Sequence, residues 1–576
     1  MDQIMRQRGA MALLGALAGG SLYLLGEVLE QGVLPDRAAL GLTAFAAVFF
    51  GAVLAMAGPL NIPRAALGAA SVALVAAGLL VLASLRFDDV DGLFGHPAPA
   101  FAFTLLASIP LPFLIAAAGP GWRDYPTLFS ESWGIVVRSA AAWVFVAVVW
   151  ALIFLSDALL ALVGITLIDR LIDIDIVPFL ITGITLGLAL AVVVELGDVV
   201  SPYLILRLLR LLLPVVLAVM ALFILALPVQ GLSRFLGGLS VAATLLAMAV
   251  AAATLVTSAI DRTAAEAVAG PLMLRATQGL ALMLPVPAAL AAYAIWLRVD
   301  QHGWTPDRLF AAKAAVLALG YGVIYALAVL RGAGWMDRIR QGNVTMALAL
   351  LVVSALWLTP LLNAEAISAR DQLARFEDGR VAVADLDVTA LENWGRPGAA
   401  ALDALRATAA EPGQGALAAR LENRGFAAVA LPETAAGVLT KLRATLPLQP
   451  PTATPTRDRL LDGFSESEHR YWLGNCLNRL PDGRPGCAML VGDFWPGLEG
   501  EEAVLISSDP SGYLVFDGLV TADGRVQRRG VAPLSGNMPL DAAGAIGAVQ
   551  SGAVALTPAP LNQITLDGQP LIIAPY

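Results

Sequence analysis

Eleven segments of about 20 mainly apolar residues follow one another through the first 363 residues of this chain. A helix of that length crosses the roughly 30 Å hydrocarbon layer of a bilayer. Most of the segments end at Arg, Asp, Pro or Gly, as helix ends at a membrane interface do. The sequence therefore predicts a polytopic α-helical membrane protein. The predicted spans are 9–27, 37–57, 64–86, 98–118, 135–156, 177–197, 203–226, 238–260, 274–297, 308–330 and 342–362.

The charged side chains are divided unevenly between two parts of the chain. Residues 1–363 hold 19 basic and 20 acidic side chains, and residues 364–576 hold 17 and 25, so the net charges are −1 and −8. Charged residues make up only 14 % of the chain and apolar ones 58 %, against about 25 % and 45–50 % in soluble domains. This composition excludes a wholly soluble protein, a disordered chain and a nucleic-acid-binding protein. The lipid bilayer is the expected partner.

The distribution of Arg and Lys among the loops predicts the orientation of the spans. With the N-terminus in the cytoplasm, twelve basic side chains lie on the cytoplasmic side and seven on the other. The cytoplasmic set is Arg6, Arg8, Arg64, Arg123, Arg138, Arg207, Arg210, Arg262, Arg275, Arg331, Arg338 and Arg340, and the opposite set is Arg37, Arg86, Arg170, Arg234, Arg298, Arg308 and Lys313. An odd number of spans then places the C-terminal part outside a bacterial inner membrane.

One stretch decides whether the number of crossings is odd. Between Asp157 and Asp175, the apolar run 158–168 is too short to cross the bilayer, which indicates an interfacial or re-entrant helix. If this stretch did cross, the C-terminal part would lie on the other side of the membrane.

Beyond residue 363 the pattern becomes that of a soluble α/β domain, predicted here to be extracytoplasmic. The expected parts are a transmembrane bundle over 1–363, a helical α/β segment over 364–445, a proline-rich linker over 446–456 and a β-rich domain over 457–576. Alternating apolar residues predict a strand at 381–388, and helical patterns fall near 397–409, 414–424 and 433–446. Short apolar runs between turn signals predict an antiparallel sheet from 488–491, 503–507, 513–516 and 525–531.

Four stretches resemble an uncharacterised family of bacterial membrane proteins, domain-of-unknown-function family 4153. They are 131–165, 298–308 (RVDQHGWTPDR), 343–375 with its ISARDQLAR string, and 391–405 (LENWGRPGAAALDAL). The resemblance spans roughly residues 120–405 and implies a multi-span membrane protein, but it supplies no catalytic residues. Within the second stretch the family-like residues are Arg298, Gln301, His302, Gly303, Trp304, Thr305, Pro306 and Arg308. This loop is either a recognition surface or an interfacial Trp-rich cap over the helix ends.

Four charged residues near the ends of two spans form a predicted ion network. Glu195 and Asp198 lie three residues apart at the end of the sixth span, and Arg207 and Arg210 lie three apart at the start of the seventh. A tight turn between the spans would pair the acids with the arginines. The network is either a structural clamp or a polar ion or proton site, and the interfacial position favours the clamp.

The loop 87–96 places Asp88, Asp89, Asp91 and His96 on the predicted outer face. Carboxylates of this kind hold a divalent cation in some membrane transferases, but three neighbouring aspartates are also common in solvated turns. The three histidines of the chain fall in three different regions, so no local zinc-spaced pair exists. There is also no GxxxxGK[ST] string, dinucleotide fingerprint or HExxH motif. The sequence therefore predicts no catalytic residue, cofactor or metal.

The only two cysteines, Cys476 and Cys487, are predicted to form a disulfide. Turn-forming Pro-Asp-Gly and Pro-Gly strings lie in the ten residues between them and would bring the two Cα atoms together. Disulfides persist outside the cytoplasm, in keeping with the predicted topology.

The sequence favours a non-enzymatic envelope protein, meaning a transporter-like or scaffolding bundle whose residues 364–576 contact a partner protein in the envelope. Two alternatives stay open. One is a membrane protein that receives a signal through its outer domain, and the other is a membrane-embedded glycosyl or lipid transferase that uses the outer Asp loop.

Overall fold

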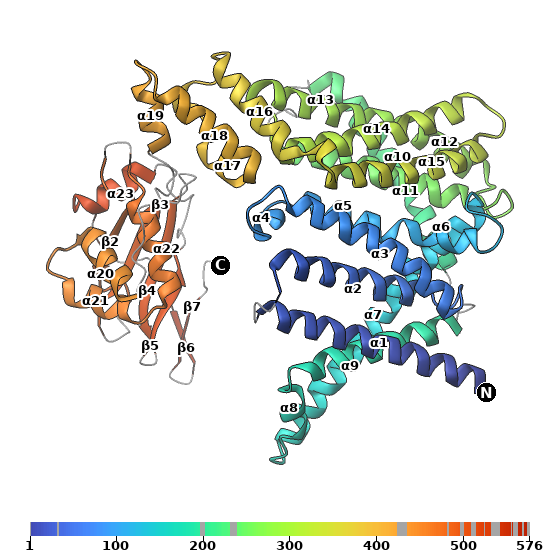
Figure 1. The fold of residues 1–576 in the computed structure, drawn as a ribbon, viewed down its shortest axis with the longest axis horizontal. Coiled ribbons are helices and arrows are strands. Elements are labelled where there is room, and N and C mark those ends of the chain that lie inside the picture. The colour runs from blue at the N-terminus through green and yellow to red at the C-terminus, as the bar shows by residue number, and fades with distance from the viewer. Residues whose placement is uncertain are drawn as a thin grey trace. The chain divides into compact units, whose positions relative to one another are not determined.

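The computed structural model describes residues 2–30, 34–195, 202–230, 239–422, 435–480, 483–495, 500–508, 514–522, 525–531, 542–554, 556, 563–566 and 569–572. The chain forms two compact units (Figure 1). The first comprises residues 1–381 and 390–403, and the second comprises residues 382–389 and 404–576.

The first unit is built from helices, which follow from the long apolar segments of the sequence. The helices that make up its long apolar segments are α1 (Asp2–Glu30), α2 (Asp36–Met56), α3 (Ile62–Ser84), α5 (Pro97–Ser108), α6 (Pro110–Ala117), α7 (Tyr125–Ala161), α9 (Ile176–Glu195), α10 (Pro202–Gln230), α11 (Leu239–Ile260), α12 (Pro271–Met283), α13 (Pro285–His302), α14 (Pro306–Leu330) and α15 (Trp335–Leu358). The other elements are α4 (Asp91–Phe94), α8 (Leu167–Ile172), η2 (Pro360–Leu362), α16 (Ala364–Glu377), α17 (Val388–Asn393) and α18 (Gly395–Ala409).

Eleven helical segments of the described part are long and apolar enough to cross a membrane, which confirms the predicted number of spans. Two of them consist of two helices in succession, α5 with α6 and α12 with α13. The breaks fall at Pro110 and Pro285, because a proline inside a helix removes a backbone hydrogen bond and its ring clashes with the preceding turn.

Glycines bring α1 and α9 into unusually close contact. Gly15 and Gly19 on α1 and Gly183 and Gly187 on α9 are each spaced by four residues, so each pair lies on one face of its helix. A Cβ atom on Gly183 would collide with the carbonyl oxygen of Gly15. Small residues at this spacing let two membrane helices approach until their backbones touch.

Contacts between helix ends show how often the chain crosses the bundle. We call the end where α1 begins the entry face and the end where α15 finishes the exit face. Arg8 at the start of α1 donates to Glu195 at the end of α9, with Nε 3.0 Å from Oε1. The chain therefore crosses an even number of times between these residues, as six spans require. Helix α8 adds no crossing, since its six residues are only about 9 Å long.

A second contact places the end of α15 on the face opposite to the start of α1. Arg86, just after α3, pairs with Glu365 at 3.0 Å, just after α15. Three spans separate Arg8 from Arg86, so this pair lies on the exit face. The chain thus enters the bundle on one face and leaves it on the other.

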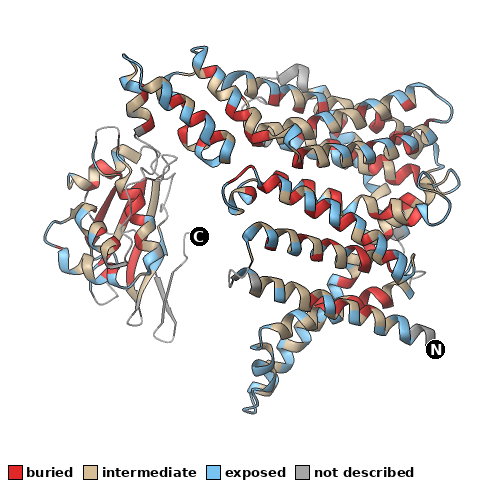
Figure 2. Ribbon diagram, in the orientation of Figure 1, coloured by how far each residue is buried: buried red, intermediate tan, exposed pale blue. Residues whose placement is uncertain are grey.

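Two apolar cores hold the bundle together (Figure 2). One joins α2, α3, α5 and α6, and the other joins α10, α11, α12 and α14. Helix α15 belongs to both, because Ile339 near its start packs into the second core and Trp357 near its end packs into the first. We call α1–α9 the first half of the bundle and α10–α15 the second half.

The second unit contains a five-stranded sheet in the order β1-β2-β3-β4-β5, in which β1 and β2 are parallel and the other neighbours antiparallel. Its elements are η3 (Val383–Asp385), α19 (Gly415–Glu422), α20 (Ala435–Thr445), β1 (Leu448–Gln449), α21 (Thr454–Asp462), α22 (Glu466–Leu477), β2 (Cys487–Gly492), β3 (Glu502–Ser508), β4 (Leu514–Ala522), β5 (Arg525–Gly530), α23 (Ala542–Gln550), β6 (Gln563–Leu566) and β7 (Gln569–Ile572). Strands β6 and β7 form a separate pair.

Helices cover both faces of the five-stranded sheet. Met489 packs toward α20, α21 and α22, and its neighbour Ala488 packs toward α23, as alternation along a strand requires. The predicted antiparallel strands are confirmed as β2 to β5, and the three predicted helices as α18, α19 and α20.

Two stretches between residues 381 and 456 differ from their sequence patterns. The strand predicted at 381–388 is wrong, because these residues form the 3-10 turn η3 and lead into α17. Aspartates at 385 and 387 favour turns over strands, which explains the difference. Residues 446–456, predicted as a linker, include β1 and the start of α21, and Leu446 and Ala453 are buried in the core of the second unit.

Candidate functional site

A cavity of about 510 Å³ lies between the two halves of the bundle. Helices α5, α6 and α7 line it from the first half, and α11, α14 and α15 line it from the second. Its walls are mostly Ala, Leu, Val and aromatic side chains. Along α14 the lining residues run from Phe310 to Tyr325, about 22 Å at 1.5 Å per residue. Ligand sites in proteins range from about 300 to 1,000 Å³, so this cavity is large enough for a ligand.

The cavity opens on the side of the bundle. Val250 lines it from the middle of α11 and is 61 % exposed, and Phe101 lines it from α5 and is 51 % exposed. The middle of a membrane span faces the hydrocarbon layer, so an opening at Val250 faces lipid and not water. A ligand that dissolves in the bilayer has direct access to this opening.

Neutral hydrogen bonds close the cavity toward the entry face. Tyr325, which is fully buried, donates to the amide oxygen of Asn343 at 2.6 Å, and its hydroxyl lies 2.7 Å from that of Thr257. The Asn343 amide nitrogen donates to the Tyr125 hydroxyl at 3.0 Å. We call these four residues the entry cluster. It joins α7 of the first half to α11, α14 and α15 of the second.

Charged and aromatic contacts join the two halves toward the exit face. His96, which precedes α5, lies 3.5 Å from Asp307 at the start of α14. One turn further into the bundle, Phe101 and Phe310 meet edge to face with ring centres 5.6 Å apart. We call these four residues the exit cluster. The hydrogen bond with the Asp307 carboxylate raises the pKa of His96 above its ordinary value.

A buried ion pair lies at the same face. Arg86 and Glu365 are 7 % and 2 % exposed, and Arg86 also donates to the carbonyl oxygens of Trp357 and Thr359 at 2.5 and 2.8 Å. Burial lowers the pKa of Arg86, and the Glu365 carboxylate opposes this shift. The ion pair ties the end of α3 in the first half to the start of α16, and the two carbonyl bonds tie it to the end of α15 in the second half.

One lysine lines the cavity close to its exit end. Lys313 lies on α14 two turns below Asp307, with its ammonium 4.6 Å from the centre of the Phe310 ring and 4.0 Å from that of Trp357. A cation over an aromatic face is attracted by the electrons of the ring. Lys313 is the one lining residue of this cavity with a charged side chain.

The predicted ion network has other partners in the structure. Glu195 pairs with Arg8, and Arg207 donates to and stacks on Tyr203. Arg210 pairs with the buried Asp261. The structure thus brings none of the three described members together, and Asp198 lies outside the described residues. The partners come from distant helices because packing, and not the turn between two spans, sets which helix ends meet.

The family-like loop 298–308 is held by α16. The Asp371 carboxylate accepts from the backbone N–H of Trp304 at 2.7 Å, and Gln372 donates to the carbonyl oxygens of His302 and Trp304. Gly303 has a φ of 74°, and a Cβ atom there would lie within 2.6 Å of side-chain atoms of α16. Two of the family-like stretches, 298–308 and 367–375, therefore contact each other at the exit face.

The remaining members of this loop have structural contacts. Arg375 donates to the carbonyl oxygen of Gln301 at 2.9 Å, and Arg308 donates to that of Gly303 at 2.7 Å. Thr305 caps α14 by accepting from the backbone N–H of Arg308, and Pro306 is the first residue of that helix. The Arg298 guanidinium lies 3.5 Å from the His302 ring. The loop therefore fixes the exit end of α14, which lines the cavity.

The acidic loop at 88–91 is held by protein partners. Asp88 accepts from Arg396 at 3.2 Å, and Asp89 accepts from the backbone N–H of Gly92 at 2.9 Å. Within the described part of the chain, no group of three or more His, Cys, Asp or Glu side chains is arranged to hold a metal ion.

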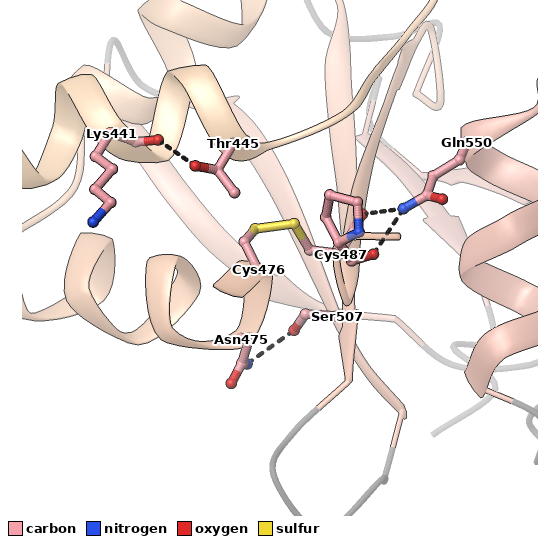
Figure 3. Close-up of a disulfide and its surroundings, with 8 residues drawn as sticks. Lys441, Thr445, Asn475, Cys476, Cys487, Ser507 and Gln550 are labelled. Carbon is pink, nitrogen blue, oxygen red and sulfur yellow. Dashed lines mark hydrogen bonds between the residues drawn. A yellow bond between two sulfur atoms is a disulfide. The ribbon is translucent and has the colours of Figure 1, made fainter. Parts of the chain in front are cut away.

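The two cysteines form a disulfide in the second unit (Figure 3). It joins the end of α22 to the start of β2, with the Cα atoms 4.7 Å apart. Asn475 donates to Ser507 at 3.0 Å beside it, and Gln550 donates to the carbonyl oxygen of Cys487 at 2.9 Å. The bridge is fully buried and fixes the turn between a helix and a strand.

Sequence reasoning missed the entry cluster. Tyr125, Asn343 and Tyr325 lie near the entry-face ends of three spans, and each taken alone has the polarity common at a membrane interface. The available signal was the position of Asn343 inside a family-like stretch. The orientation count treats Lys313 as a basic side chain on the outer side of the membrane, whereas it lies seven residues into α14 and lines the cavity.

The chain matches the protein family described as a domain of unknown function (DUF4153) over residues 38–405. The match begins before the family-like stretches at 120–405 and includes every residue that lines the cavity. No curated protein matches the chain. No solved structure matches it either.

Proposed function

The chain belongs to the DUF4153 family of unknown function, and from its geometry we propose that it is a non-enzymatic, transporter-like protein for a lipid-like ligand. The single observation behind this proposal is the cavity between the two halves, which is apolar, opens toward lipid and is closed at its two ends by different clusters. A ligand that enters beside Val250 would leave when the exit cluster separates.

The arrangement favours transport over a solid scaffold. In a scaffold the two halves need no space between them, whereas here large aromatic side chains stand around an open volume. The transferase alternative has less support, since Asp88 and Asp89 have protein partners. Without a phosphate-binding string in the sequence, movement of the ligand down its gradient is expected.

We propose further that the protein lies in a bacterial inner membrane with its exit face outward. The excess of twelve basic side chains over seven and the disulfide of the second unit both support this orientation. A membrane-impermeant maleimide on intact cells should label Asp378→Cys near the exit face. It should label Arg123→Cys near the entry face only after permeabilisation. The reverse labelling pattern would contradict the orientation.

The predicted envelope partner of residues 364–576 stays a proposal. Trp495 is 56 % exposed, and its backbone N–H and that of Phe494 are held by the buried Glu502 carboxylate. A photo-reactive side chain at Trp495 should cross-link a partner protein in intact cells, and the absence of any cross-link would count against the proposal.

Transport is tested with the full chain in liposomes that contain a fluorescent phospholipid. Transbilayer movement is followed by the fraction of fluorophore that an external quencher bleaches. Ala253→Trp fills the cavity from α11 and should stop the movement. Ala251→Trp on the exposed side of the same helix is the matched control and should leave it unchanged. Equal rates for both variants, or no movement with the unchanged protein, would overturn the proposed function.

A further inference from the structure

The lysine in the cavity is unusual for this chain. Of 36 basic residues only two are lysines, Lys313 and Lys441, and the other 34 are arginines. Six arginines near the helix ends of the bundle pair with carboxylates, namely Arg8, Arg86, Arg138, Arg210, Arg262 and Arg340, and others, such as Arg308 and Arg338, donate to backbone carbonyl oxygens. Within the described residues Lys313 makes no ion pair and donates no hydrogen bond, and its ammonium lies over the rings of Phe310 and Trp357.

Beside Lys313 lies a second hydrogen-bond donor without an acceptor, the indole N–H of Trp357. Trp357 is 2 % exposed, and its indole Nε1–H has no hydrogen-bond partner among the described residues. The Lys313 ammonium is 4.0 Å from the centre of this same ring. A buried donor without an acceptor is destabilising, and an unpaired charge inside a membrane more so. An anionic oxygen that enters this end of the cavity would pair with the Lys313 ammonium, which lines the cavity, whereas Trp357 adjoins Lys313 but is not itself a lining residue.

The rest of the cavity wall is mostly apolar. Below Lys313 the lining residues on α14 are Ala314, Leu317, Ala318 and Tyr321. The polar side chains that also line the cavity, Ser132, Trp133, Thr254, Tyr321 and Ser354, are neutral, and the entry cluster satisfies its own hydrogen bonds. The site therefore has one cationic end and a long, mostly apolar wall, which is the complement of a lipid with a charged headgroup.

We propose that Lys313 binds the anionic headgroup of a membrane lipid whose chain fills the cavity toward the entry cluster. This inference rests on the proposed function and names its ligand class. Lys313 lies about 10 Å below the exit end of α14, so the headgroup is held inside the bundle and not at its surface. Charge complementarity selects a lipid whose headgroup has a net negative charge over a zwitterionic one, whose phosphate is already balanced by its own cation.

Lipid retention by the purified full-length protein tests the inference. The protein is exchanged into phosphatidylglycerol, phosphatidylcholine or an equal mixture, and retained lipid is measured by mass spectrometry. Lys313→Met should reduce retained phosphatidylglycerol at least about tenfold, the effect of one charge-assisted hydrogen bond. Lys313→Arg should keep most of it, and Lys441→Met is the matched control and should keep all of it.

A second measurement needs no variant, because the chain has only two lysines. Acetic anhydride is added to the unchanged protein, and acetylation of Lys313 is compared with that of Lys441 in the same sample. Phosphatidylglycerol should slow the acetylation of Lys313 about tenfold or more and leave Lys441 unaffected. Phosphatidylcholine and inorganic phosphate should not protect Lys313.

The outcomes separate this inference from the proposed function. If phosphatidylcholine is retained and protects as well as phosphatidylglycerol, and Ala253→Trp abolishes both, lipid transport stands and the headgroup role of Lys313 is wrong. Protection by inorganic phosphate alone would also overturn it, since the ligand would not be a lipid. If neither lipid is retained and neither moves across liposomes, both proposals fail.

Discussion

The two ends of the cavity are closed by contacts of different chemistry. At the entry face, α7 and α15 are joined by neutral hydrogen bonds between Tyr125, Asn343 and Tyr325. At the exit face, the halves are joined by the His96–Asp307 and Arg86–Glu365 pairs. Neutral hydrogen bonds among buried side chains respond little to pH or salt, whereas exposed ion pairs respond to both. The difference indicates that the exit end is the one whose closure the surroundings can alter.

The exit end is itself heterogeneous. Glu365 is 2 % exposed, but Asp307 is 60 % exposed in side-chain terms. We therefore expect the buried Arg86–Glu365 pair to stay formed at all times, and the partly exposed His96–Asp307 pair to be weak. When the exit cluster separates, the Arg86–Glu365 pair would stay intact and the His96–Asp307 pair would break.

The largest expected effect is at the buried exit pair. Glu365→Gln leaves Arg86 with an uncompensated charge in a buried site, and breaking such a pair costs about 3 kcal/mol or more. Thermal unfolding in detergent should show a marked loss of folded protein. Glu377→Gln, exposed on the same helix α16, is the matched control. Removing both charges with Arg86→Met and Glu365→Met should recover part of the stability. If Glu365→Gln were as stable as Glu377→Gln, the Arg86–Glu365 pair would not be what holds the exit face together.

A smaller effect is expected at the entry cluster. Asn343→Leu removes the amide that Tyr125 and Tyr325 share, which costs about 1–2 kcal/mol for two lost neutral hydrogen bonds. The loss should be the same across the pH range in the same unfolding measurement. Gln341→Leu, exposed on α15, serves as the control. A loss that depends on pH would show that the entry end also contains a titrating contact, and the contrast between the ends would fail.

The smallest effect concerns the pH dependence of the exit cluster. Because Asp307 raises the pKa of His96, the protonated form stabilises the folded state. This contribution is present below the unfolded pKa of about 6.5 and is lost as the pH rises through the higher folded value. It stays below about 1 kcal/mol because the pair is partly exposed.

The unfolding temperature of the unchanged protein should therefore fall relative to that of His96→Gln as the pH rises, and Asp307→Asn should abolish this difference. If the unfolding temperatures of the unchanged protein and of His96→Gln changed in parallel with pH, the His96–Asp307 contact would not contribute to the pH dependence of stability.

The span pattern could be predicted from the sequence because each span is a continuous apolar segment whose length is set by the bilayer. The antiparallel strands were predictable for a similar local reason, since turn signals separate short apolar runs. The strand expected at 381–388 failed because a local alternation says nothing about whether a pairing strand is near.

The candidate site could not be predicted in the same way. Glu195 meets Arg8, 187 residues away, because the glycines of α1 and α9 bring those helices together. Tyr125 and Asn343 are separated by 218 residues, and only the packing of α7 against α15 brings them together. A cavity forms where several packed helices leave space between them, so it cannot be predicted from the sequence of any one helix.

In the proposed transport, a lipid-like ligand leaves the cavity when the exit cluster separates. Phe101→Cys with Phe310→Cys places two thiols where the aromatic rings now meet at 5.6 Å. Since Cys476 and Cys487 are bonded to each other, a short bis-maleimide reacts only with the introduced pair. In liposomes, cross-linking should stop the movement of the fluorescent lipid, while each single-cysteine variant treated with the same reagent should retain it. Unchanged lipid movement after complete cross-linking would contradict the account.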